Sequence, residues 1–312
     1  MADIIVQGER WFPSPSTFAD DLPTLWGDWG CDSEVGRLRA VLMRRPGPEV
    51  DRLIDPEPFR WAAAVDPGVA RAQHDALADV YRAHGVKVHY VENMRKDRPN
   101  AVFVRDLMFM TPEGAIIGRP AMASRRGEER FVTEALGALG VPVLLTVHGE
   151  GTFEGACAMW VDRKTVVLGT GVRCNRAGAN QVEGILRDIG VERVIRYQIP
   201  FGSIHLDGVI NIADRDKAMI FPWQVPYDVC RELIDMGFKL IENPHIDEIK
   251  GSLGCNFVAI EPGVVVMPAG NPKSKAVLEE AGVVVIDVQI DELMKGLGAV
   301  HCMTAFLKRD PI

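Results

Sequence analysis

The chain has 312 residues, which is enough for one large domain or two small ones. Hydrophobic residues make up 47% of the chain and charged residues 25%, a composition that is typical of a globular protein and excludes disorder as the main state. The 35 Lys and Arg residues against 43 Asp and Glu residues give a net charge of −8 without a long basic run, so we exclude nucleic acid as a partner.

Residues 1–30 contain three tryptophans and three prolines and predict an irregular N-terminal arm that packs onto the rest of the chain. These first residues lack the basic leader and apolar stretch of a secretory signal. No segment approaches 18 consecutive apolar residues, so we expect a cytoplasmic protein that does not span a membrane. The six cysteines are scattered and form no CxxC pair, which argues against a disulfide framework or a Cys-rich zinc site.

A helix pattern that ends in glycine and continues directly into a β-branched strand occurs five times. The glycines lie 45 to 55 residues apart, at Gly85, Gly140, Gly190, Gly237 and Gly282. Each occupies the position where a helix ends in a left-handed residue, so the repeat has a backbone reason.

A strand, a short turn and a second strand lie between successive repeats. Their turns are Pro-Glu-Gly, Asp-Arg-Lys, Asp-Arg-Asp and Glu-Pro-Gly, which are typical of hairpins. The first unit is predicted from a strand at Leu38–Met43, a helix near Pro67–Ala83 and a strand at Val86–Val91. The segment AVHCMTAFL after Gly298 then supplies the strand that this unit lacks.

These units predict an α/β fold, a five-fold pseudosymmetric α/β propeller of strand-strand-helix-strand units with the helices outside. We expect one domain over residues 1–312. The alternative is a doubly wound parallel sheet with hairpin insertions. No GxGxxG motif follows a strand and no GxxxxGK[ST] motif occurs, so nothing indicates a nucleotide site.

Polar residues interrupt the apolar first strands of successive units, where burial of an unpaired polar group is costly. They are Asp106, Glu154 and the pair His205 and Asp207, and a ring would direct all of them toward its centre. Cys302 in the closing strand joins the same region. We interpret Cys31, Cys174, Cys230 and Cys255 as small buried hydrophobes, and His301 as a neighbour that points to the opposite face and not as the base.

A thiol beside an imidazole is a nucleophile with a proton shuttle. Three carboxylates around it would raise the pKa of the thiol, which argues against a protease that acts on neutral peptides. The arrangement fits a cationic substrate, because paired carboxylates such as Asp106 and Asp207 can bind a planar guanidinium through several hydrogen bonds.

The motifs VRDLMF, EGAC, HLDGVINIAD and GAVHCMT resemble those of the guanidine-modifying enzymes, which include arginine deiminases, dimethylarginine dimethylaminohydrolases, agmatine deiminases and amidinotransferases. The resemblance runs from about Leu38 to the last residue and implies the same five-fold propeller. It implies that Cys302 is the nucleophile, that His205 is the acid and later the base, and that Glu154 orients and helps to protonate. Asp106 and Asp207 would hold the guanidinium.

The resemblance also points to Arg125, in SRRGEE, and to Arg173 as residues that bind a substrate carboxylate. Three positions depart from the arginine deiminase pattern. Leu297 replaces an arginine that binds the substrate carboxylate, His301 is more like the amidinotransferases and agmatine deiminases, and Cys157 replaces the second acid of an E-x-x-D motif.

We therefore expect a hydrolase that uses no cofactor and no metal and cleaves a C–N bond of a carboxylate-bearing, arginine-like guanidino or amidino compound through a covalent Cys302 thiouronium. One alternative is an amidinotransferase, in which an amine resolves the same intermediate. Another is a non-catalytic propeller that acts as a binding factor. The expected partner is the small guanidino substrate, and the sequence leaves a homo-oligomer open.

Overall fold

The structure is a computed structural model that describes residues 13–312. Within them, fifteen strands form five three-stranded sheets. In every sheet the middle strand pairs antiparallel with one neighbour and parallel with the other. The sheets are β15 (Ala305–Arg309), β1 (Leu38–Met43) and β2 (Lys87–Tyr90); β3 (Met108–Thr111), β4 (Gly114–Ile117) and β5 (Val143–Thr146); β6 (Ala158–Asp162), β7 (Thr165–Thr170) and β8 (Arg193–Gln198); β9 (Ile210–Asp214), β10 (Lys217–Ile220) and β11 (Lys239–Glu242); and β12 (Val258–Glu261), β13 (Val264–Pro268) and β14 (Val284–Val288).

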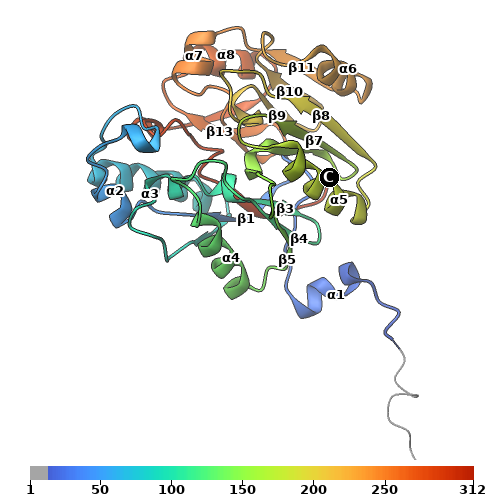
Figure 1. Cartoon of the computed structure of the whole chain (residues 1–312). Coiled ribbons are helices and arrows are strands. Elements are labelled where there is room, and N and C mark those ends of the chain that lie inside the picture. The colour runs from blue at the N-terminus through green and yellow to red at the C-terminus, as the bar shows by residue number, and fades with distance from the viewer. Residues whose placement is uncertain (1–12) are drawn as a thin grey trace, which may run out of the picture.

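One helix connects the middle strand of each sheet to its parallel neighbour, so the predicted strand-strand-helix-strand unit is present five times. The connecting helices lie on the outside of the body in Figure 1, with the sheets inside. They are α3 (Pro67–Ala83), α4 (Glu128–Leu139), α5 (Arg176–Asp188), α6 (Tyr227–Asp235) and α8 (Pro272–Glu280). Shorter helical segments occupy the connections: α2 (Pro48–Asp51), α7 (Ile246–Gly251), α9 (Asp291–Met294), η1 (Glu57–Phe59), η2 (Pro99–Val102), η3 (Val104–Leu107), η4 (Gly155–Cys157) and η5 (Leu206–Gly208).

The five glycines that follow the connecting helices all have φ between +77° and +92°. Side chains with a Cβ rarely adopt this region, and glycine enters it without steric cost. The glycine repeat therefore marks each point where the chain leaves a helix and turns back into the sheet, as the sequence predicted.

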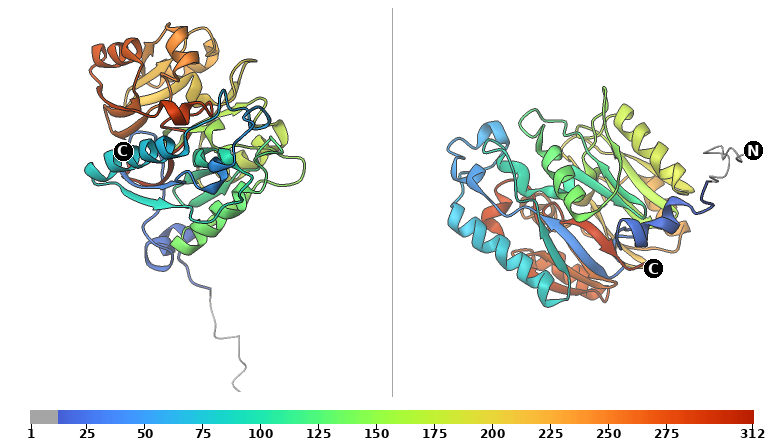
Figure 2. Two further views of the ribbon diagram at one scale, coloured as in Figure 1. Left: turned by 90° about the vertical axis from the view of Figure 1, so that its left-hand side faces the viewer. Right: turned by 90° about the horizontal axis from the view of Figure 1, so that it is seen from below.

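Neighbouring sheets touch mainly through their first strands and the turns before them, and also through the middle strand β1. β15 contacts β3, β1 contacts β12, and β12 contacts β9, while the turn before β6 contacts the turns before β3 and β9. Trp160 of β6 stacks on Phe109 of β3 with ring centroids 5.5 Å apart, and its indole N–H donates to the carbonyl of Met110. Figure 2 shows β1 and the last strand side by side, although they lie at opposite ends of the sequence.

The expectation of an irregular arm over residues 1–30 is wrong for its second half. Phe18–Leu25 form helix α1, because Thr17 and Asp20 make a reciprocal capping box that satisfies free N–H groups at its start. The arm joins the body at Gly30, whose N–H donates to the carbonyl of Leu307 at 2.9 Å. Residues 1–12, including Trp11, lie outside the described residues.

Candidate active site

Each of the five units contributes a polar side chain from the segment just before its first strand. Asp106 precedes β3, Glu154 precedes β6, His205 and Asp207 precede β9, Asn256 precedes β12, and Cys302 precedes β15. All six side chains are buried, with at most 6% of their surface exposed. The equivalent positions of the units therefore converge on one site.

We expected these residues to lie in the first strands, but they lie in the segments just before them. Asp106 and Asp207 lie in the short 3-10 helices η3 and η5, Glu154 and His205 directly precede η4 and η5, and Cys302 lies in a turn three residues before β15. The turns η3, η4 and η5 contact one another, which brings their side chains together. The argument that His301 points away on the opposite strand face therefore loses its basis.

Gly155 explains how Glu154 reaches this place. A Cβ at Gly155 would collide with the carbonyl oxygens of Met108 and Arg105, so the backbone of η4 lies directly against the backbone that carries Asp106. Only glycine permits that close approach. The glycine of the EGAC motif thus sets the spacing between the two carboxylates.

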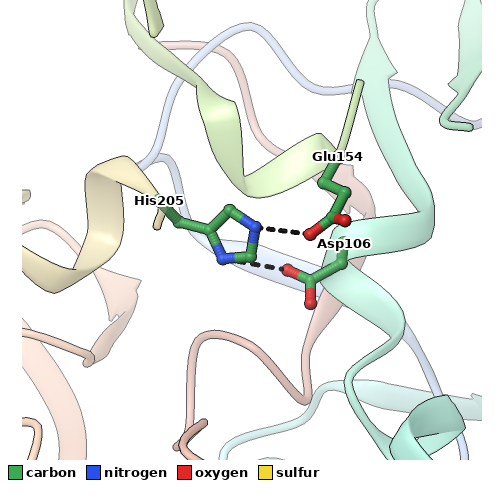
Figure 3. Close-up of side chains that lie close together, drawn as sticks. All are labelled: Asp106, Glu154 and His205. Atoms are coloured by element: carbon green, nitrogen blue, oxygen red, sulfur yellow. Dashed lines mark hydrogen bonds and ion pairs between the residues drawn. The ribbon is translucent and has the colours of Figure 1, made fainter. Parts of the chain in front are cut away.

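His205 lies between two carboxylates (Figure 3). Its Nε2 is 2.7 Å from Glu154 Oε2, and its Nδ1 is 3.5 Å from Asp106 Oδ1. Burial disfavours the charged imidazolium, but Asp106 and the hydrogen bond to Glu154 outweigh burial and raise the pKa of His205. The ring therefore keeps its protonated form, which is the form that can donate a proton, to a higher pH than an ordinary histidine does.

Two arginines hold these carboxylates. Arg173 Nη1 lies 3.1 Å from both oxygens of Glu154. Arg125 forms an ion pair with Asp106, and its remaining contacts are Glu128 Oε2 at 2.9 Å and the carbonyls of Asn100 and Phe103. Asp106 Oδ1 and Arg173 Nε are buried without a hydrogen-bond partner in the described part of the chain. Asp106 Oδ1 thus has only the 3.5 Å contact with His205 Nδ1, and Arg173 holds Glu154 through Nη1 alone.

The environment of Cys302 explains its resting state. Its Sγ lies 3.5 Å from Asp207 Oδ2, and Asn256 Nδ2 donates to it at 3.2 Å. Burial together with Asp207 and Asp106 raises the pKa of the thiol well above its ordinary value, and the hydrogen bond from Asn256 opposes that rise. The site therefore holds a neutral thiol until a positive charge arrives beside these carboxylates.

His301 belongs to the site through a second buried network. Its Nδ1 is 2.8 Å from Asp207 Oδ2, and its Nε2 is 3.4 Å from Glu34 Oε2. Burial lowers the pKa of His301, but the hydrogen bonds to Asp207 and Glu34 outweigh burial and raise it. His301 thus holds the carboxylate that faces Cys302, and Arg105 contacts Glu34 at 3.3 Å behind it.

A cavity opens beside these groups, and we call it the first cavity. Asp106, His205 and Cys302 line its floor, and Arg125 and Arg173 line its walls. Arg60 lies at its exposed mouth, and Phe59, Asn100, Phe103, Ile204, Gly296, Leu297 and Gly298 complete the lining. A thiol, an imidazole and the carboxylate of Asp106 in a cavity that arginines also line suit a molecule with a cationic head and an anionic tail.

Sequence reasoning missed Asn256, Glu34, Arg60 and Glu128. Asn256 had a signal, because it occupies the same place in the fourth hairpin as the predicted residues occupy in theirs. The other three lie in irregular connections or at a helix start, where no pattern distinguishes them. His148, which the sequence left without a role, is exposed and outside the cavity.

Asp106, Glu154 and His205 also offer ligand atoms within 4.8 Å of one another, the spacing of a metal site. Arg125 and Arg173 already neutralise the two carboxylates, and the ring nitrogens of His205 face those same carboxylates. The ligand atoms of this cluster are therefore already paired with protein groups. The expectation that no metal takes part stays a prediction.

Comparison with known proteins supports this chemistry. The family model described as N,N dimethylarginine dimethylhydrolase, eukaryotic, matches residues 64–309. A dimethylarginine dimethylaminohydrolase of Streptomyces coelicolor is 28% identical over 271 residues, which cover 86% of this chain and 97% of that protein. An arginine deiminase of Rhodococcus erythropolis is 24% identical, over 91% of this chain and 98% of its own length.

Among solved structures, a cysteine-to-serine variant of the Pseudomonas aeruginosa dimethylarginine dimethylaminohydrolase, complexed with citrulline, superposes with a TM-score of 0.70. It is 26% identical to this chain, and the match covers 86% of this chain and 99% of that one. The fold and these relatives define the chain as a guanidine-modifying enzyme, an amidine or guanidine C–N hydrolase or an amidinotransferase. It belongs to the N,N-dimethylarginine dimethylhydrolase family. Among the described residues, no helix is long and apolar enough to cross a membrane.

Proposed function

We propose that this chain hydrolyses a C–N bond of a carboxylate-bearing, arginine-like guanidino compound without a metal or cofactor. The observation that carries the proposal is the buried thiol of Cys302 next to Asp207, in a cavity that Asp106 also lines and where Asp106 Oδ1 accepts no hydrogen bond and has only a 3.5 Å contact with His205 Nδ1. A guanidinium supplies the missing donors and cancels the negative charge that suppresses the thiolate. We also propose that residues 13–312 form one five-fold pseudosymmetric propeller domain with the site at its centre.

The reaction begins when the guanidinium lies between Asp106 and Asp207. Cys302 releases its proton to water as the guanidinium binds, its Sγ attacks the guanidine carbon, and the protonated His205 delivers its proton to the departing nitrogen. The C–S bond forms, the C–N bond breaks, and an amine or ammonia leaves. Glu154 keeps His205 in the required orientation through its contact with Nε2.

Water resolves the resulting thiouronium. The neutral His205 accepts a proton from water as the oxygen attacks the carbon, the C–S bond breaks, and the product is a ureido compound. An acceptor amine in place of water would make the same chain an amidinotransferase.

Arg173 and Arg125 serve different roles in this proposal. Arg173 lines the first cavity and supplies the contact for the substrate carboxylate, with the exposed Arg60 adding positive charge. The donors of Arg125 are largely engaged by protein oxygens, so it mainly positions Asp106, whereas the sequence analysis gave it a substrate carboxylate.

The test is turnover of a panel of guanidines by the purified chain, with Cys302→Ser as the inactive control. The panel contains arginine, its Nω-methyl and Nω,Nω-dimethyl derivatives, and agmatine. Mass spectrometry then distinguishes ureido products from new guanidines formed with an added amine. Ureido products establish hydrolysis, and new guanidines establish amidino transfer. If neither kind of product forms, the result favours the binding-factor alternative.

A further inference from the structure

Cys302 faces a second cavity as well as the first. His205, Ile204 and Leu297 also line both cavities. Ile204 and Leu297 therefore form the partition between them, and the thiol lies at the place where they meet. Leu297 has a φ of +61° and is 53% exposed, so its side chain stands at the rim and not in the core.

The second cavity has a different chemical character. Its walls include Ile249 and Leu253 beside the two partition residues, and it contains no arginine. Gly208 also lines it, and a Cβ there would meet nothing within 4 Å. The cavity therefore has open space along an apolar wall, next to the groups that face the guanidinium.

Lys250 supplies the cation of this cavity. Its Nζ donates to Ser203 Oγ at 2.6 Å and to the carbonyl of Gly202 at 3.3 Å, and Ser203 Oγ in turn donates to Gln224 Oε1. No carboxylate lies within ion-pair distance of this ammonium in the described part of the chain. Two protein acceptors thus hold the ammonium of this exposed residue in place, and the Phe221 ring lies 5.7 Å from it, while no carboxylate pairs with it, which leaves its charge available to an anionic group in the cavity.

The shape of a guanidine connects the two cavities. Its central carbon carries three nitrogens in one plane, so a molecule whose tail occupies the first cavity directs a different nitrogen away from that tail. A substituent on this nitrogen needs space on the other side of Cys302. The second cavity is the space that borders Cys302 and His205 there.

We propose that the second cavity binds a substituent on the departing nitrogen, a short apolar arm that ends in a carboxylate held by Lys250. This inference rests on the proposed hydrolysis and names its substrate class, an arginine-like compound with an acidic Nω-arm. Sγ forms its bond to the guanidine carbon, the bond to the arm-bearing nitrogen breaks, and His205 protonates that nitrogen. The product that leaves from the second cavity is an amino acid, and water then releases the ureido product.

The decisive measurement compares two ligands whose arms have the same shape, Nω-(2-carboxyethyl)-L-arginine and Nω-(3-methylbutyl)-L-arginine. Calorimetry with the Cys302→Ser chain measures their affinities without turnover. We expect the carboxyethyl compound to bind roughly tenfold more tightly, the usual effect of one charge-assisted contact. Carboxymethyl and carboxypropyl arms, each against its alkyl counterpart, establish the preferred length.

Four further variants in the same background assign the difference in affinity to the second cavity. Lys250→Met should abolish the preference, Lys250→Arg should retain part of it, and Lys239→Met, an exposed lysine on β11 that lines neither cavity, should leave it unchanged. Gly208→Leu should lower the affinity for both Nω-substituted ligands and leave the affinity for L-arginine unchanged. Equal affinities for the matched ligands, no binding of either, or a preference that survives Lys250→Met would overturn the proposal.

Turnover by the unmodified chain separates this inference from the proposed function. Release of β-alanine and citrulline from the carboxyethyl compound supports both. Hydrolysis of methylated arginines without a Lys250-dependent preference supports the proposed hydrolase and contradicts the proposal of an acidic arm. A Lys250-dependent preference in binding with no turnover of any guanidine supports the cavity assignment and contradicts the hydrolase.

Discussion

Asn256 Nδ2 lies 3.2 Å from Cys302 Sγ, and its amide oxygen accepts the backbone N–H groups of His301 and Cys302 at 3.0 and 3.3 Å. One buried amide thus holds both the turn that carries the thiol and the sulfur itself. The donated hydrogen bond favours the thiolate, so Asn256 acts against the two carboxylates that raise the pKa of Cys302.

Asn256→Ala should therefore raise the thiol pKa further and slow alkylation of Cys302 at a given pH. Asn256→Asp should slow it more, because a third carboxylate would face the sulfur. The measurement is the pH profile of iodoacetamide modification, followed by mass spectrometry at Cys302. A profile in Asn256→Ala that coincides with that of the unmodified chain would show that the amide only fixes the turn.

Cys302→Ser should abolish turnover and leave the thermal unfolding midpoint nearly unchanged, because oxygen is a poorer nucleophile of almost the same volume. A chloroacetamidine probe should label Cys302 and not the fully buried Cys174 or Cys255. The matched control is Cys230→Ser, which changes the half-buried cysteine of α6 and should remain active. Comparable labelling at Cys174 or Cys255 would contradict the assignment.

His205→Ala should lower kcat by about 10²–10⁴-fold, the usual contribution of a positioned acid–base group. Asp106→Asn should raise KM and lower kcat together, because an amide cannot pair with the guanidinium and also removes the ion pair with Arg125. Steady-state kinetics on the best guanidine of the panel measure both. Near-normal kcat and KM in Asp106→Asn would be incompatible with a cationic substrate at this position.

Arg173→Leu should raise KM for a carboxylated guanidine by roughly 10–100-fold, the range expected for a charge-assisted contact. The effect on agmatine, which lacks the carboxylate, should be smaller. Because Arg173 also contacts Glu154, kcat on agmatine reports any damage to the position of that carboxylate. Equal losses on both substrates would indicate that Arg173 only supports Glu154.

The pair His301 and Asp207 should make stability depend on pH. The pKa of His301 is raised above 6.5, so its contribution is complete below about pH 6.5 and is lost as the pH rises through the folded-state value. Burial raises the pKa of Asp207, but His301 outweighs it and lowers the pKa below 3.8, so that contribution is lost as the pH falls through its folded-state value.

His301→Gln should therefore lower the free energy of unfolding most between about pH 4 and 6.5, by on the order of 1.5–3 kcal/mol. The loss should be smaller at pH 9. Urea unfolding of both chains across this range measures the difference. A difference in unfolding free energy that stays constant from pH 5 to pH 9 would mean that His301 contributes through packing and not through its charge.

The repeat made most of this site predictable. A glycine with positive φ follows the connecting helix of each unit and so marks the units in the sequence. Comparison of equivalent positions in these units then identified the polar residues Asp106, Glu154, His205, Asp207 and Cys302. The 3-10 turns were not predicted, because three or four residues directly before an apolar strand cannot be told from the start of that strand by periodicity. Lys250 and Arg60 had no signal, since each side chain reaches a cavity from a connection whose course depends on tertiary packing.

The pairing of β1 with β15 has a consequence for when reactivity appears. Leu42 pairs with Ala305, so more than 260 residues separate two strands that must meet before Cys302 reaches His205. Contacts of such long sequence separation form late, because the loop-closure entropy precedes any gain from packing. A chain that has folded its other four units is therefore expected to have the acids and the histidine in place while Cys302 is still apart from them. The complete set of groups then comes together only when the last strand joins the first sheet.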